Sequence, residues 1–313
     1  MFVRVIAIDG LSKWFPGRSE PAIEGIDLNL RNGEILGLVG LNGAGKTTTI
    51  RIAAGVAFPT SGQVLVDGHD IVHDKVRASE AIGWVPEHYP FAPEARARRL
   101  LIYHAGFHGL TGRQADGRAR EALCRVGLQG FEDVQIRTYS QGMRRRFGLA
   151  AAMLADPQNL LLDEILNGLD PEGMAFVRSW VVELRKQGKG VLLSSHLLSE
   201  LQALADRVAF IHEGNLIRVV GREELARAGK TTLHIILENA DSNLITYLGT
   251  LGAVKVEQHA ILVSQPAEPQ ATITAELVRR GYRVAEIWSE NASLEEYFLK
   301  LIRVDSALEG EGT

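Results

Sequence analysis

The sequence has almost no cysteine and no long apolar run. Its one cysteine, Cys124, cannot form an internal disulfide, and this scarcity fits a reducing compartment. One of the longest apolar stretches, at residues 147–155, is far shorter than the roughly 18 residues that a membrane-spanning helix needs. Arg4 and Asp9 stand where a secretion signal would be apolar. We therefore expect neither a segment that crosses a membrane by itself nor a secretion signal.

A strong excess of charge of one sign is also missing. The formal net charge is −4, which argues against a protein whose main role is to coat nucleic acid. Hydrophobic residues make up 46% of the chain and charged residues 23%, the balance of a folded protein rather than a disordered one. A chain of 313 residues favours about two domains.

Hydrophobic periodicity predicts an α/β fold. Residues 1–75 show short apolar or alternating runs typical of strands, and residues 94–155 show the three-to-four spacing of helices. From residue 159 strands and helices alternate, which predicts a parallel sheet covered on both faces. The predicted domains are an α/β domain at 1–220 with a helical subdomain at about 88–155, a linker at 221–230, a small α+β domain at 231–305, and a frayed tail at 306–313. Within the small domain we expect helices near 241–251, 269–280 and 293–304.

A phosphate-binding loop is predicted at residues 40–48, GLNGAGKTT, which match G-x-x-x-x-G-K-[ST]. The motif follows an apolar strand and opens a helix, which is the setting it requires. Glycines let successive backbone N–H groups point at one anion, and the positive end of the helix dipole adds to the attraction. Lys46 is expected to bind the β- and γ-phosphates and Thr47 to ligate Mg²⁺. The predicted nucleotide-binding residues of this loop are Gly40, Leu41, Asn42, Gly43, Ala44, Gly45, Lys46, Thr47 and Thr48.

Two acidic residues and a histidine follow apolar strands that end at the same predicted sheet edge. Residues 160–164, LLLDE, place Asp163 and Glu164 beside the phosphate loop. We expect Asp163 to hold the metal ion and Glu164 to orient or deprotonate the attacking water. His196, which follows VLLSS, is expected to hydrogen-bond the γ-phosphate or that water.

Five motifs then follow in a fixed order: the phosphate loop, YSQGMRRR at 139–146, LLLDE, NGLDP at 167–171, and SSH at 194–196. In this order and at these gaps, residues 3–220 resemble the ATP-binding subunit of an ABC transporter, and in particular the branch that exports drugs and antibiotics. The resemblance implies a P-loop NTPase fold with ATP and Mg²⁺ as cofactors. It also implies ATP hydrolysis that powers a separate membrane permease for export, and a peripheral place on the cytoplasmic face of the cell membrane.

In that family two ATP-binding subunits pair head to tail when ATP is bound, and each ATP lies between the phosphate loop of one subunit and the signature motif of the other. The resemblance thus implies an ATP-dependent dimer, with two copies of this chain as the expected pair. It further implies that an aromatic residue, Phe15 or its neighbour Trp14, stacks on adenine. The remaining residues that it assigns to nucleotide binding are Ser140, Gln141 and Gly142 of the signature and Asp170 at the dimer seam.

Three positions depart from the family pattern. Glu87 stands where the family has a lid glutamine; it can still ligate Mg²⁺, but it adds a negative charge near the phosphates. Gln141 and Met143 replace the usual Gly and Gln of the signature. Residues 165–166, Ile-Leu, replace the usual Pro-Thr, and the loss of the proline frees φ at the turn beside Glu164.

The main alternative is a soluble ABC-type ATPase that acts on ribosomes or nucleic acid. Known families of that kind carry two ATPase units or a long coiled coil, whereas this sequence has one phosphate loop and no long heptad stretch. A GTPase would need N-K-x-D, which is not found. The transporter reading is therefore favoured and no nucleic-acid partner is expected. For the small C-terminal domain, an accessory packing or dimer-supporting role is favoured over a ligand sensor.

Overall fold

The computed structural model describes residues 4–196, 198–228, 231–257 and 260–291. The chain divides into two compact units, Met1–Arg222 and Glu223–Thr313. Each unit is described by itself below. Within the described parts of the chain, no helix combines the length and the apolar character needed to cross a lipid bilayer.

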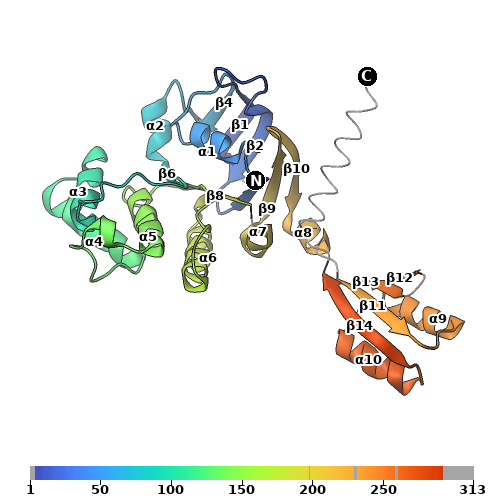
Figure 1. Ribbon diagram of the computed structural model, residues 1–313. Coiled ribbons are helices and arrows are strands. Elements are labelled where there is room, and N and C mark those ends of the chain that lie inside the picture. Colours follow the sequence, from blue (N-terminus) through green and yellow to red (C-terminus); the bar gives the residue numbers. More distant parts are fainter. Residues whose placement is uncertain (1–3, 197, 229–230, 258–259, 292–313) are drawn as a thin grey trace. The chain divides into compact units, whose positions relative to one another are not determined.

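A six-stranded sheet in the order β10-β9-β3-β8-β7-β6 forms the centre of the first unit (Figure 1). Neighbouring strands from β9 to β6 are parallel, and only β10 runs antiparallel to its neighbour. Its strands are β3 (Ile35–Val39), β6 (Ile82–Val85), β7 (Asn159–Leu162), β8 (Gly190–Ser195), β9 (Arg207–His212) and β10 (Asn215–Gly221). Every residue of β3, β7 and β8 is buried, as expected for parallel strands covered on both faces.

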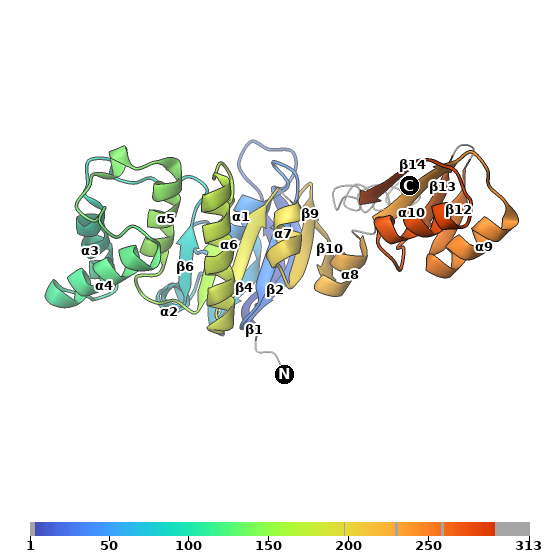
Figure 2. The ribbon, with the colours of Figure 1, turned by 90° about the horizontal axis from the view of Figure 1, so that it is seen from below.

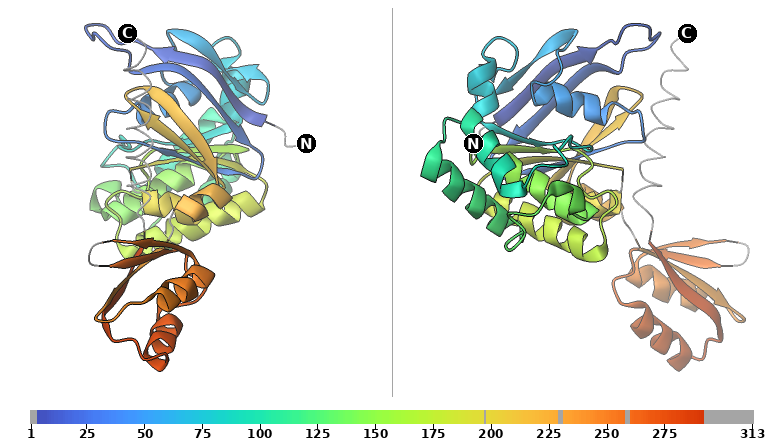
Figure 3. Two further views of the ribbon diagram at one scale, coloured as in Figure 1. Left: turned by 90° about the vertical axis from the view of Figure 1, so that its right-hand side faces the viewer. Right: turned by 60° about the vertical axis from the view of Figure 1, so that its left-hand side comes forward.

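Each face of this sheet is covered by a different layer. Helices α6 (Pro171–Lys186) and α7 (Leu198–Leu204) cover one face (Figure 2). The other face packs against helix α1 (Lys46–Ala53) and a four-stranded antiparallel sheet, drawn in blue opposite α6 in Figure 3. The strands of this second sheet are β1 (Arg4–Lys13), β2 (Ile23–Arg31), β4 (Ser61–Val66) and β5 (His69–Asp70), and helix α2 (Lys75–Glu80) follows them. The predicted parallel sheet covered on both faces is confirmed.

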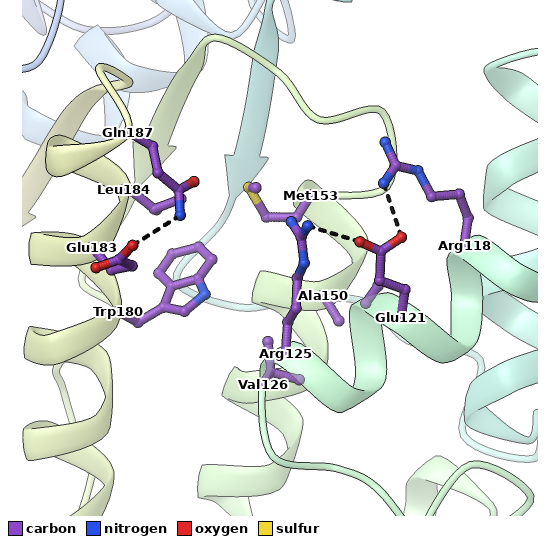
Figure 4. Close-up of a pocket in the computed structure, with 11 residues that line it drawn as sticks. Arg118, Glu121, Arg125, Val126, Ala150, Met153, Trp180, Glu183, Leu184 and Gln187 are labelled. Carbon is purple, nitrogen blue, oxygen red and sulfur yellow. Dashed lines mark hydrogen bonds and ion pairs between the residues drawn. The ribbon is translucent and has the colours of Figure 1, made fainter.

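A helical segment is inserted between β6 and β7. It contains α3 (Ala97–Phe107), α4 (Gly112–Arg125), the short 3₁₀ helix η1 (Ile136–Thr138) and α5 (Gln141–Ala152). A cavity of about 240 Å³ separates α4 and α5 from α6 (Figure 4). Trp180 of α6 and Met153 face this cavity, and Arg118 and Arg125 share the carboxylate of Glu121 at its rim.

The second unit begins with α8 (Arg222–Ala228), which occupies most of the segment treated above as a linker. Two acidic residues in its first turn, Glu223 and Glu224, favour a helix start through the helix dipole. It continues as β11 (Thr231–Leu237), α9 (Ser242–Leu251), β12 (Ala253–Val256), β13 (Ile261–Ser264), α10 (Gln270–Arg279) and β14 (Val284–Asn291).

The strands of the second unit pair antiparallel in the order β12-β13-β11-β14. This order and the β-α-β-β-α-β succession define a ferredoxin-like fold. One face of its sheet forms a core with α9 and α10, centred on Leu233, Leu248 and Ile273. The helix predicted at 293–304 and the tail at 306–313 lie outside the described residues.

Candidate functional site

Four parallel strands end at one edge of the central sheet, and the predicted site residues follow them. Gly40 follows β3, Asp163 follows β7, His196 follows β8, and Glu87 lies two residues beyond β6. Because the strands are parallel neighbours, their carboxyl ends meet at the same edge. The tertiary structure thus brings together residues that are up to 156 positions apart in the sequence.

The loop between β3 and α1 can be built only with glycine at two positions. A Cβ atom at Gly40 would lie 2.3 Å from the carbonyl oxygen of Ile211. Gly45 has φ of 109°, and a Cβ atom there would lie 2.8 Å from the carbonyl oxygen of Ala22. The loop is therefore held against the backbone of β9 and β2, which explains the glycine spacing of the motif.

Lys46 is buried at the base of this loop. Its Nζ donates hydrogen bonds to the carbonyl oxygens of Gly40 (2.8 Å) and Leu41 (3.2 Å). The same Nζ lies 3.2 Å from Oε1 of Glu164, and both side chains are only 6% exposed. Lys46 thus forms a buried ion pair with the residue predicted to activate water.

Asp163 is held by two hydroxyl groups. Thr47 Oγ1 donates to its Oδ1 at 3.2 Å, and Ser194 Oγ donates to the same oxygen at 2.8 Å. Burial raises the pKa of Asp163, and the two hydroxyl hydrogen bonds act in the opposite direction. Ser194 also accepts a hydrogen bond from the backbone N–H of Glu164 at 2.9 Å, so it orients both acidic residues. The role of Ser194 was missed, although it lies in the SSH motif.

Glu164 has left-handed backbone geometry, with φ of 48°, and three side-chain partners. Besides Lys46, its carboxylate contacts His196, whose Nδ1 lies 3.1 Å from Oε2, and Asn167, whose Nδ2 donates to Oε2 at 2.9 Å. Asn167 was not predicted as a site residue. Its place in the NGLDP motif, three residues after Glu164, was the available signal.

A cleft of about 510 Å³ opens over these groups, within the size range of ligand sites. Most of the predicted loop residues line it, as do Glu87, Glu164 and His196. Phe15 lines the cleft and is 39% exposed, whereas Trp14 is not among the lining residues. Two basic side chains that were not predicted, Arg18 and Arg51, also line it. The loop residues in the lining are Asn42, Gly43, Ala44, Gly45, Lys46, Thr47 and Thr48.

The oxygen donors at the cleft fit Mg²⁺. Thr47 and Asp163 are in direct contact, and Glu87 lines the cleft with Thr47. Hydroxyl and carboxylate oxygens are the ligands that this ion prefers, and it usually keeps further ligands from phosphate and water. The parts of the chain that the structure describes contain no group of three or more His, Cys, Asp or Glu residues placed to hold a metal ion.

The predicted signature residues lie away from this cleft. Ser140 is the N-cap of α5, and its Oγ accepts a hydrogen bond from the N–H of Met143 at 3.2 Å. Asp170 caps α6 in the same way, through the N–H of Gly173 at 2.9 Å. Gln141 and Gly142 lie against residues 168–169, so the starts of α5 and α6 are neighbours. None of these residues is in the lining of the cleft described above.

A family profile described as "ABC transporter" matches residues 23–167. The bacitracin transport ATP-binding protein BcrA of Bacillus licheniformis is 33% identical, with 91% of this chain and 93% of that protein covered. The daunorubicin resistance ATP-binding protein DrrA3 of Streptomyces coeruleorubidus is also 33% identical, with 95% of each chain covered. A solved dimeric bacterial ABC transporter cassette superposes with a TM-score of 0.64 at 21% identity, covering 69% of this chain and 98% of that one.

Proposed function

The chain belongs to the ATP-binding subunits of ABC transporters, the family whose ATP hydrolysis is coupled to transport, and from this premise we propose how its own residues carry out that work. The cleft binds MgATP, and hydrolysis drives export through a separate membrane permease. The observation that carries the proposal is the contact network of Lys46, Thr47, Asp163 and Glu164 at one sheet edge. Related proteins named for bacitracin transport and daunorubicin resistance support antibiotics or similar compounds as cargo.

Binding of ATP requires Lys46 to exchange partners. In the structure its ammonium group is held by Glu164 and by two loop carbonyls. Phosphate oxygens entering the loop offer more negative charge, so Lys46 turns to them and leaves Glu164. Loop N–H groups and the start of α1 add further donors and a favourable dipole. Thr47, Asp163 and Glu87 would hold Mg²⁺, which when bound neutralises charge on the phosphate oxygens.

Release from Lys46 frees Glu164 to act on water. Its Oε2 remains held by His196 and Asn167, so the carboxylate keeps its direction while Oε1 becomes available. A carboxylate fixed in this way can orient the attacking water and accept its proton, a contribution of about 10²–10⁴-fold in rate. Because the ion pair with Lys46 must break first, the carboxylate becomes available only when nucleotide occupies the loop.

The signature residues act on the nucleotide of a second subunit. They lie outside the cleft of their own chain, and Ser140 caps a helix whose positive end is open to an anion. A head-to-tail pair would place this helix start against the γ-phosphate bound by the partner. The solved dimeric cassette with the same fold supports such a pair, and two copies of this chain are the proposed subunits.

The permease docks beside the lid residue. A groove of about 670 Å³ has Trp84, Glu87, His104 and Asp163 among its lining residues. Tyr103 and Phe107, on the neighbouring helix α3, are 64% and 73% exposed and pack edge to face. Exposed aromatic pairs of this kind are typical anchors of protein interfaces. A subunit docked here lies on the cytoplasmic face of the cell membrane.

The test is copurification from native membranes with ATP and the tagged Glu164→Gln protein. This substitution should keep ATP binding and slow turnover, which traps the ATP-bound dimer. We expect recovery of a multi-spanning membrane protein, lost when Lys46→Ala is added or when ATP is omitted. Tyr103→Ala/Phe107→Ala should lower this recovery while ATP hydrolysis by the purified protein is retained.

Other outcomes would redirect the proposal. A soluble dimer that copurifies with ribosomes or DNA would support the alternative of a soluble ATPase. Unchanged nucleotide affinity in Lys46→Ala would refute the assignment of the phosphate loop. Unchanged turnover in Glu164→Gln would place the base elsewhere.

A further inference from the structure

Arg145 lies on α5 and reaches the lid segment of its own chain. Its Nη1 donates a hydrogen bond to the backbone carbonyl oxygen of Glu87. Arg145 and Glu87 also line a common cavity of about 190 Å³, together with Gly148 and Tyr89. Glu87 in turn lines the nucleotide cleft. Arg145 thus contacts a residue that lines the proposed nucleotide cleft, although it comes from the helix that starts with the signature.

The guanidinium group lies within the electric field of the site's acidic residues. Burial lowers the pKa of Arg145, while the negative charges of Glu87, Asp163 and Glu164 act to raise it. These are the lid residue and the two acids that follow β7. Arg145 therefore places a half-buried positive charge near the acidic residues proposed to hold Mg²⁺ and to act on water.

The two neighbouring arginines have different surroundings. Arg144 donates to the carbonyl oxygen of Arg137, and Arg146 lies over the ring of Phe176, 4.6 Å from its centroid. Consecutive helix residues point in different directions, so the run of three arginines is not one basic patch. Arg144 lines the same cavity as Arg145 but donates to Arg137, whereas Arg145 donates to the lid backbone, so Arg144 offers a matched control.

The charge at residue 87 explains why a cation is useful there. Glu87 lines the proposed nucleotide cleft and adds a negative charge beside the place of the phosphates. A Glu–Arg pair carries the same net charge as glutamine beside a neutral residue. An uncompensated carboxylate would repel ATP whenever Mg²⁺ is absent.

We propose that Arg145 is the counter-charge of Glu87 and a positioning residue of the nucleotide site. It holds the lid backbone by one hydrogen bond and offsets the lid carboxylate, so that Glu87 approaches the metal ion without repelling ATP. This inference rests on the proposed MgATP site. It assigns to α5 a second role, in the nucleotide site of its own chain.

The experiment compares Arg145→Gln, Glu87→Gln, the double variant and the control Arg144→Gln. Two quantities are measured: the affinity for a fluorescent ATP analogue in EDTA, and the Mg²⁺ concentration that half-saturates the nucleotide-bound protein. We expect Arg145→Gln to weaken metal-free nucleotide binding about tenfold, a usual coupling between neighbouring charged groups. The half-saturating Mg²⁺ concentration should fall, because the site becomes more negative. A merely structural defect would weaken both interactions.

The double variant decides the outcome. With glutamine at residue 87 no lid charge is left to offset, so the metal-free nucleotide affinity of Glu87→Gln/Arg145→Gln should lie within about threefold of that of Glu87→Gln alone. Arg145→Lys, which keeps the charge, should leave metal-free binding nearly unchanged. A double variant as weak as Arg145→Gln alone, or an Arg145→Gln protein with unchanged metal-free affinity, would overturn the proposal. An unmodified protein that binds no nucleotide would instead overturn the proposed function.

Discussion

The buried ion pair of Lys46 and Glu164 should make nucleotide-free protein sensitive to the loss of either charge alone. Both side chains are 6% exposed, so the pair is governed by burial rather than by surface screening. Removing one partner of a buried pair costs about 3–5 kcal/mol, because an uncompensated charge remains. In Lys46→Met, His196 and Asn167 still contact Glu164. Because these two contacts remain, we expect the loss of unfolding free energy to lie at the lower end of that range, at about 3 kcal/mol.

The double variant Lys46→Met/Glu164→Gln should recover most of this loss. It removes the unpaired charge and keeps an oxygen that can accept from Asn167. The loop carbonyls of Gly40 and Leu41 remain without their donor, so a deficit of about 1 kcal/mol should persist. For a unit of this size, about 3 kcal/mol corresponds to a fall in melting temperature of roughly 6–12 °C.

The assay is urea unfolding in EDTA without nucleotide, followed by tryptophan fluorescence. A Trp288→Phe background removes the tryptophan of the second unit, so the signal reports on Trp14, Trp84 and Trp180 of the first. If Lys46→Met were as stable as the parent, the ion pair would not contribute to stability. If the double variant were no more stable than Lys46→Met, an unpaired charge would not be the cause of the loss.

Three further predictions concern the loop, the catalytic contact and the second unit. Gly45→Ala should lower the free energy of unfolding by about 1–3 kcal/mol more than Gly43→Ala, because of these two positions an added methyl group clashes only at residue 45. Equal losses of unfolding free energy in the two variants, measured by urea unfolding, would contradict this. Asn167→Ala should slow single-turnover hydrolysis about tenfold with ATP affinity unchanged, since it removes one hydrogen bond to Glu164; unchanged turnover would exclude the contact. Two neighbouring arginines lower the pKa of Glu276 from 4.5 to about 2, so its stabilising effect is present above pH 4.5 and lost as the pH falls toward 2. Glu276→Gln should flatten the acid dependence of unfolding in that interval, as measured by circular dichroism.

The gathering of the proposed site residues at one sheet edge could be predicted because its signals are local in the chain. The glycines of residues 40–45 are required by backbone geometry that spans a few residues. Asp163 and His196 directly follow buried strands, and the alternation of strands and helices predicts that these strands are parallel. The residues that follow these strands, a carboxylate after β7 and an imidazole after β8, indicate the chemistry at the shared edge.

The partners of these residues could not be predicted in the same way. Ser194 was read as part of a motif, but its hydrogen bonds to Asp163 and to the backbone of Glu164 depend on how β7 and β8 are placed side by side. Asn167 bonds to Glu164 within one turn of the chain, but the direction of its side chain is decided only by the folded turn. The contact between Arg145 and Glu87 joins residues 58 positions apart and depends on the orientation of α5 in the inserted helical segment.

The second unit shows the same division. Most of its described strands and helices could be located from periodicity, since side-chain spacing along an element reflects only the geometry of that element, but α8 was taken for a linker. In the folded unit β11 pairs with both β13 and β14. The sequence does not decide this pairing, because several of the predicted strands could have paired with β11. The sequence by itself therefore determined the elements, the loop chemistry and the family, which depend on residues close together in the chain. Only the folded structure decided which distant side chains meet, because those contacts depend on packing across the whole unit.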